Sequence, residues 1–200
     1  MEGQILISIG REFGSAGHEI GETIAKRLGI NFYDRAMLDE LAQNYGIDKS
    51  TLEKYDEKRK IPFLSRTVRG YSNSLEDMVF EFQSKYILDK AQKGDSFVIV
   101  GRCGDMILKD KPGFVSLFIL GDKEEKIARI KDIYKLNTDE AYEKMRRHDK
   151  KRKAYHNSRC SSKWGDSRTY DLCINSSKLG TEQTVDILMD YIEFRTKQTN

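Results

Sequence analysis

The chain has 200 residues, of which 38% are hydrophobic and 34% are charged. This length allows one domain with a substantial core, and a single domain over residues 1–200 is predicted. The formal net charge is only +3, so no bulk attraction to nucleic acid exists and no nucleic-acid partner is expected.

The number of cysteines and the lack of long apolar runs predict the cellular compartment of the protein. Cys103, Cys160 and Cys173 are too few and too scattered to predict a disulfide framework or a zinc site, which favours a reducing cytosol. No charged and apolar signal segment precedes the first predicted strand, and no apolar run approaches a membrane span. We therefore expect a cytoplasmic protein without a membrane partner.

Five short apolar runs are predicted as strands, at residues 5–9, 31–33, 97–100, 114–120 and 172–174. Between the strands, apolar residues recur at helical spacing and predict helices at residues 20–28, 36–44 and 75–87. A further helix is predicted to begin with Thr138 as its cap, and a last one spans 181–194. This alternation predicts a mostly parallel sheet with helices on both faces. Ligands of such sheets bind at the carboxyl ends of the strands, so the loops after Ile9, Tyr33 and Val100 should share one cleft.

The stretch GREFGSAGHEIG, which runs from Gly10 to Gly21, is the most informative motif. It follows a predicted strand and precedes a predicted helix. Glycines allow the backbone to curl with its N–H groups inward, and a helix N-terminus adds partial positive charge, so the motif predicts a phosphate cradle. A P-loop has Gly-Lys-Ser/Thr at this turn, whereas His18 and Glu19 follow Gly17 here.

Further motifs extend the pattern downstream: Phe32-Tyr33-Asp34, Val98-Ile99-Val100-Gly101-Arg102, an Arg/Asp-rich segment at 146–152, Trp164-Gly165-Asp166 and the strand and turn at 170–180. With the glycine loop they resemble the cytidylate kinase-like family, a divergent branch of the P-loop nucleoside monophosphate kinases, over nearly the full length. The resemblance implies a three-layer α/β sandwich with a mostly parallel five-stranded sheet. It also implies an acceptor-side arm at 46–74 and an arginine-rich lid at about 146–166.

The activity implied by the resemblance is transfer of the γ-phosphate of ATP, with Mg²⁺, to a nucleoside monophosphate or a similar small acceptor. Two alternatives stay open: a catalytically weak nucleotide-binding regulator of the same fold, and, less favoured, an RNA or DNA surface built from the basic patches. A homo-oligomer also stays open.

On the donor side, the resemblance implies that the loop backbone holds a nucleotide phosphate. Arg11 would supply the charge that a mostly neutral histidine cannot. A structural tight turn and a solvent-exposed arginine are the alternatives. Magnesium is assigned to Ser15 and Asp105, because Val100 stands where ordinary relatives carry an aspartate. The loop residues assigned to the nucleotide are Gly14, Ser15, Ala16, Gly17 and His18.

On the acceptor side, Asp34, Arg35 and Arg102 are the expected phosphate or substrate contacts. Their alternatives are a helix cap for Asp34, a solvated side chain for Arg35 and a structural ion pair for Arg102.

The lid supplies the remaining catalytic candidates. Asp149 and Arg152 match the family's lid and lie on one face of a helix, with a surface ion pair as the alternative. Arg146 falls one residue from the first lid arginine. For the aromatic residues Tyr155 and Trp164, lid packing is favoured over base stacking.

Overall fold

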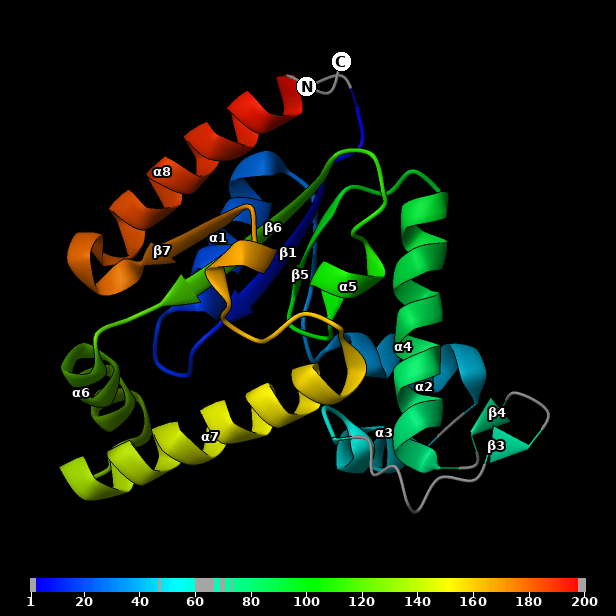
Figure 1. The fold of residues 1–200 in the computed structure, drawn as a ribbon, viewed down its shortest axis with the longest axis horizontal. Helices are drawn as coiled ribbons and strands as arrows, with labels where there is room; N and C mark the ends of the chain where they lie inside the picture. The colour runs from blue at the N-terminus through cyan, green and yellow to red at the C-terminus, as the bar shows by residue number, and fades with distance from the viewer. Residues whose placement is uncertain (1–2, 47, 60–66, 69–70, 73, 198–200) are drawn as a thin grey trace.

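The computed structural model describes residues 3–46, 48–59, 67–68, 71–72 and 74–197 (Figure 1). Its elements in chain order are β1 (Leu6–Arg11), α1 (Gly17–Leu28), β2 (Asn31–Tyr33), α2 (Met37–Tyr45), α3 (Lys49–Tyr55), β3 (Thr67–Val68), β4 (Tyr71–Ser72), α4 (Leu75–Gln92), β5 (Phe97–Val100), α5 (Gly104–Ile107), β6 (Phe114–Leu120), α6 (Lys123–Tyr134), α7 (Thr138–Arg159), the 3-10 turn Ser167–Thr169, β7 (Leu172–Asn175) and α8 (Ser176–Lys197).

The main sheet has five strands in the order β2-β5-β1-β6-β7. Every neighbouring pair is parallel, and Leu6 at the start of β1 is in register with Phe97 of β5 and Phe114 of β6. The predicted α/β fold is therefore confirmed, with an all-parallel five-stranded sheet. Because the strands share one direction, the loops after β1, β2 and β5 meet at the same edge.

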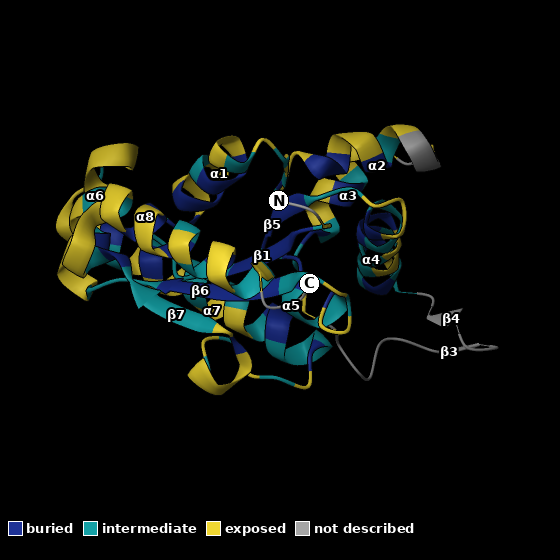
Figure 2. Cartoon of the chain, turned by 90° about the horizontal axis from the view of Figure 1, so that it is seen from above, coloured by how far each residue is buried: buried dark blue, intermediate teal, exposed yellow. Residues whose placement is uncertain are grey.

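Alternation along β1 divides the core into two layers. Ile5, Ile7 and Ile9 pack against α1 and α8, whereas Leu6 faces the cluster formed with α2, α3 and α4. Strands β1 and β5 are drawn as buried in Figure 2, with helices on both sides. A sheet that buries both faces explains why its strands are continuous apolar runs in the sequence.

Several predicted boundaries shift in the structure. The strand at 5–9 becomes Leu6–Arg11, and the last helix begins at Ser176 rather than 181, with a break at Gly180. The long helix α7 is capped by Asn137, not by Thr138: Asn137 accepts from the Glu140 N–H while the Glu140 carboxylate accepts from the Asn137 N–H.

The ranges predicted as arm and lid contain the following elements. Within 46–74 lie α3 and the β3–β4 hairpin, whereas residues 47, 60–66, 69–70 and 73 lie outside the described residues. The predicted lid is the second half of α7 with the segment that follows it. Figure 1 shows α7 crossing the end of the sheet toward which the strands point, from α6 to the neighbourhood of α3 and α4.

Candidate active site

The loop between β1 and α1 curls because its glycines allow close approaches. Gly14 has φ +90°, and a Cβ there would lie 2.9 Å from the Lys126 carbonyl oxygen. A Cβ on Gly17 would lie 2.5 Å from the Cβ of Arg11. Ala16 also adopts the left-handed conformation, with φ 59°. This segment therefore cannot carry larger side chains at positions 14 and 17 without shifting its neighbours.

The curled loop leaves several backbone donors available. Within the described chain, no protein acceptor pairs with the N–H groups of Gly14, Gly17 or His18. They border an open cavity of about 320 Å³ at the N-terminus of α1. Free amides at a helix N-terminus fit an anionic group such as a phosphate.

The two glutamates of the motif do not fill this cradle. The Glu12 carboxylate accepts from the Gly121 N–H at 3.1 Å and from Lys126 Nζ at 2.7 Å. Glu19 forms an ion pair with Arg129. Both negative charges are thus compensated by cations of α6 or by a backbone donor outside the loop.

His18, which stands in place of the usual lysine, bonds to the acceptor-side turn. Its Nε2 lies 2.8 Å from Asp34 Oδ2, while Asp34 Oδ1 accepts from the Ala36 N–H at 2.7 Å. Burial favours the neutral carboxyl, but the hydrogen bonds from His18 and Ala36 prevail and lower the pKa of Asp34. Asp34 thus closes its own turn and also ties it to the glycine loop.

Three arginines converge beside the loop, around two carboxylates from the end of α3. Arg102 donates to Glu57 Oε1 at 2.5 Å and to Asp56 Oδ2 at 3.1 Å. Arg11 Nη1 lies 3.9 Å from the same Glu57 oxygen, and Arg152 Nη1 donates to the Arg11 carbonyl oxygen at 3.2 Å.

Burial makes these charges interact strongly. Desolvation and the nearby Arg152 lower the pKa of Arg11 to about 9. Burial favours neutral Glu57, but attraction to Arg102, Arg11 and Arg152 outweighs it and lowers the pKa of Glu57 to about 2. The Nε atoms of Arg11 and Arg102 are buried and have no partner within the described residues. A cluster with spare buried donors and an excess of positive charge fits an additional anion.

The backbone that carries Arg102 is strained. Gly101, Arg102 and Cys103 have consecutive positive φ angles of 79°, 58° and 55°. The left-handed region costs a non-glycine residue about 1–2 kcal/mol, and such residues cluster at functional sites. The turn brings the buried Arg102 side chain to the carboxyl edge of the sheet.

Helix α7 is tied to the glycine loop by the two lid residues that the sequence predicted. Asp149 Oδ1 accepts from the Phe13 N–H at 2.7 Å, and the Arg152 guanidinium lies 5.4 Å from the centre of the Phe13 ring. Burial raises the pKa of Asp149 although the Phe13 N–H and Lys126 oppose it. These two side chains therefore contact the loop and do not form a surface ion pair with each other.

Of the other predicted site residues, Arg146 lies apart from this cluster, whereas Arg35 lies at its edge beside Asp56. Arg146 is exposed and pairs with Glu143 on the same helix at 3.0 Å. Arg35 is also exposed and lies 3.7 Å from Glu53 and 4.0 Å from Asp56.

The two residues assigned to magnesium do not lie together. Ser15 is buried, and its Oγ lies 2.9 Å from the Glu12 carbonyl oxygen and 3.0 Å from that of Ile119, so its hydroxyl is turned into the loop backbone. Asp105 lies on α5, where it bonds to His156 of α7. Val100, in place of the relatives' aspartate, is a buried member of the core.

Asp56 and Glu57 are site residues that the sequence does not predict. They follow α3 and meet Arg102 only through the fold, so no local pattern marks them. The packing expected of the lid aromatics is present: Tyr155 is buried, and Trp164 packs edge-on against Phe118.

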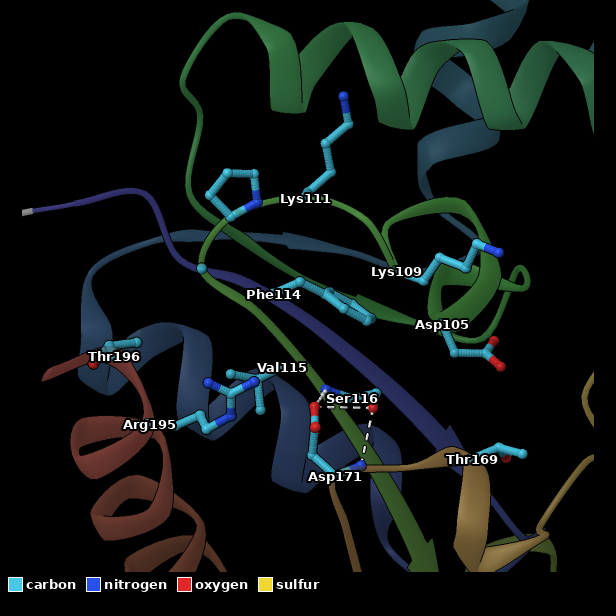
Figure 3. A pocket seen from close by; sticks show the side chains of 12 residues that line it. Asp105, Lys109, Lys111, Phe114, Val115, Ser116, Thr169, Asp171, Arg195 and Thr196 are labelled. Carbon is cyan, nitrogen blue, oxygen red and sulfur yellow. Dashed lines mark hydrogen bonds between the residues drawn. The ribbon is translucent and has the colours of Figure 1, made fainter. Parts of the chain in front are cut away.

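A second open cavity, of about 310 Å³, lies at the start of β6 and is shown in Figure 3. Its floor is closed by Asp171, whose Oδ2 accepts from the Ser116 N–H at 2.7 Å and from the Ser116 hydroxyl at 3.0 Å. The arginine cluster does not line it, although Asp105 does.

The fold and the loop define a P-loop kinase architecture. The chain is similar to shikimate kinase from Bacteroides thetaiotaomicron, with a TM-score of 0.56, 12% identity and coverage of 94% of this chain and 98% of that chain. It is also similar to shikimate kinase from Acinetobacter baumannii in complex with shikimate, with a TM-score of 0.53, 12% identity and coverage of 97% and 95%. At these identities the likeness concerns the fold.

A model of the cytidylate kinase-like family matches residues 6–178, and the chain belongs to that family. An uncharacterized protein from Eubacterium ventriosum ATCC 27560 is 37% identical, with a TM-score of 0.76 and coverage of 95% of this chain and 99% of that chain. A search of curated proteins found no match. Among the described helices, none combines the length and apolar character needed to cross a membrane.

Proposed function

We propose that the protein is a phosphotransferase that moves the γ-phosphate of ATP to a nucleoside monophosphate or a similar small acceptor. The observation that carries this proposal is the meeting of Arg11, Arg102 and Arg152 beside a loop with free amides. Phosphoryl transfer asks a protein chiefly for positioning and for stabilisation of charge on the moving group, and this cluster supplies both.

On the donor side, the N–H groups of Gly14 and Ala16 to His18 would hold the terminal phosphates of the nucleotide. ATP, when bound, supplies the phosphoryl group and its leaving group. Arg152 reaches the loop from α7 and Arg11 reaches it from β1, so two guanidiniums replace the single ammonium of a P-loop lysine.

On the acceptor side, Arg102 would bind the anionic group of the substrate. Asp34 and Arg35 follow β2 at the same edge of the sheet and would orient the rest of the acceptor. An acceptor phosphate would take the place of Glu57 on Arg102, because both are anions that bind a guanidinium through oxygen atoms.

Magnesium remains a prediction from the family. The hydroxyl of Ser15 is engaged with backbone carbonyls, and Asp105 bonds to an imidazole away from the cradle, so these two residues do not fit a shared Mg²⁺ site. We therefore assign no step to the metal.

The activity is tested by incubating the protein with ATP, MgCl₂ and a panel of nucleoside monophosphates and small hydroxyl acceptors, and by measuring ADP. We expect ADP formation with at least one acceptor. Arg152→Ala should reduce the rate by about 10³-fold, because it removes positive charge from the transferring group. Arg146→Ala is the matched control, since Arg146 lies on the same helix but is exposed, and its rate should not change.

Two other results would instead support one of the two alternative functions. Saturable ATP binding without turnover of any acceptor would replace the enzyme by a nucleotide-binding regulator. Failure to bind triphosphates, together with salt-sensitive binding to oligonucleotides, would favour the nucleic-acid surface.

A further inference from the structure

Three side chains of different chemistry meet between α5 and the end of α7, beside the small cavity that Arg102 also lines. A carboxylate oxygen of Asp105, an imidazole nitrogen of His156 and the sulfur of Cys160 all lie within 4.8 Å of one another. His156 Nε2 is 2.8 Å from Asp105 Oδ2. Cys160 is the C-cap of α7, and its N–H donates to the His156 carbonyl oxygen at 2.8 Å, so the two residues lie one turn apart at the end of this helix.

The cluster is enclosed yet reachable. His156 and Cys160 are 5% and 8% exposed. A small cavity of about 20 Å³, lined by Asp105, His156 and Cys103 among others, lies beside them. This volume is enough for one water-sized body. Asp105 also lines the larger open cavity of Figure 3, so it borders both spaces.

The donor set favours a particular kind of ion. Thiolate and imidazole are soft or borderline ligands that select zinc over magnesium or calcium. In a tetrahedral zinc site the donor atoms lie about 3.3–3.7 Å apart. The Asp105–His156 contact of 2.8 Å is shorter than this value, and all three donor atoms lie within 4.8 Å of one another, so the donors are already near the spacing that a zinc ion needs.

We propose that Asp105, His156 and Cys160 form a zinc site. As the metal binds, the one proton that the Cys160–His156 pair holds passes to solvent, so that Cys160 binds as the thiolate and His156 as the neutral imidazole. The thiol of Cys103 contacts that of Cys160 and is the candidate for the fourth ligand. The fold thus brings the Cys103–Asp105 segment to the distant His156–Cys160 segment, a meeting that the sequence does not reveal.

A metal at this place would link two parts of the candidate active site. Asp105 follows the strained turn that carries Arg102, and His156 lies one helical turn beyond Arg152. The metal would hold the end of α7 against α5 and so limit the motion of both arginines. Its role would be structural, because the arginine cluster and the metal ligands are different side chains.

The site is tested by the metal content of the full-length protein purified without chelator, and by replacing zinc with Co²⁺. We expect one ion per chain and a thiolate-to-cobalt charge-transfer band. Cys160→Ser should abolish the band and weaken zinc binding by at least ~100-fold, the upper end of the loss seen when only an outer-shell partner is removed. Cys173→Ser is the matched control, because Cys173 lies on β7 outside the cluster, and it should keep both metal and band.

Folding is checked separately by thermal unfolding of each variant. Zinc should raise the unfolding temperature of the wild type and of Cys173→Ser, but not that of Cys160→Ser. Wild-type protein that binds neither zinc nor cobalt would overturn the proposal. A cobalt spectrum unchanged by Cys160→Ser, or isolation of the protein with Cys103 and Cys160 joined in a disulfide, would do so too. None of these readouts depends on phosphotransferase activity.

Discussion

His148 shows how one side chain is adjusted by its place on α7. Its ring stacks on Phe13 with centroids 4.2 Å apart and planes 9° apart. Burial and the charges of Arg152, Lys144 and other basic neighbours lower its pKa to about 4. The imidazole is therefore neutral near pH 7, and protonating it would place another cation beside the glycine loop.

This pKa predicts a pH dependence of stability. In the unfolded chain His148 takes up a proton near pH 6.5, whereas in the folded protein it does so only near pH 4. Between these values the unfolded state binds more protons, so the contribution of His148 to stability falls as the pH is lowered from about 6.5 to about 4. His148→Phe keeps an aromatic ring and cannot titrate. Its unfolding temperature should fall less over this range than that of the wild type, and parallel curves would contradict the assignment.

Among the elements, helix α3 positions the two carboxylates that follow it, Asp56 and Glu57, beside Arg102. Glu57 has a left-handed backbone, with φ 50°, and holds Arg102 together with Asp56. Carboxylates that occupy a guanidinium compete with any other anion for it. Under the proposed function, the position of α3 and its two carboxylates should therefore depend on whether an anion is bound to Arg102.

Glu57→Gln tests this competition. Removing one charge of a buried pair is expected to lower the free energy of unfolding by up to about 3–5 kcal/mol, measured by urea denaturation. The same change should tighten the binding of inorganic pyrophosphate in calorimetric titration, because Arg102 and Arg11 lose their internal anion. Glu53→Gln is the control, since Glu53 lies on α3 and pairs with exposed Arg35. Weaker binding by Glu57→Gln would show that Glu57 supports the anion site instead of competing for it.

The sequence predicts some of the helices and strands and not others, for physical reasons. Continuous apolar runs identified all five strands of the main sheet, and the glycine loop marked the turn between β1 and α1. Helix α6 was not predicted, because its Lys123–Tyr134 segment is largely charged and its apolar stripe is short. Asp56 and Glu57 reach Arg102 from a distant part of the chain, so only tertiary structure reveals that contact. The two arginines of α7 also have different environments: Arg152 faces the glycine loop, whereas Arg146 faces solvent. Which face of the helix turns toward the loop depends on how α7 packs, so the sequence alone does not predict this difference.

For the whole molecule, stability depends on a sheet that is buried on both faces. Leu117 in β6 is fully buried in the layer shared by α1 and α8. The candidate site lies at the carboxyl edge of this sheet, so its geometry depends on the packing of the sheet against α1 and α8.

Leu117→Ala should lower the free energy of unfolding by about 2–5 kcal/mol, because a cavity remains where the side chain packed. Urea denaturation measures this loss. Ile187→Ala, on the exposed side of α8, should change it far less. Equal losses at the two positions would mean that this layer is not the main source of stability.

Helix α7 has a consequence for ligand exchange. It is one uninterrupted helix of 22 residues, about 33 Å long. Asp149, Arg152 and His156 hold it to the glycine loop, to β1 and to α5 in successive turns. A stiff rod held at several points cannot open piece by piece, because lifting one contact strains the next. Any ligand held between this rod and the glycine loop should therefore enter and leave through a single, all-or-none pivot of the whole helix.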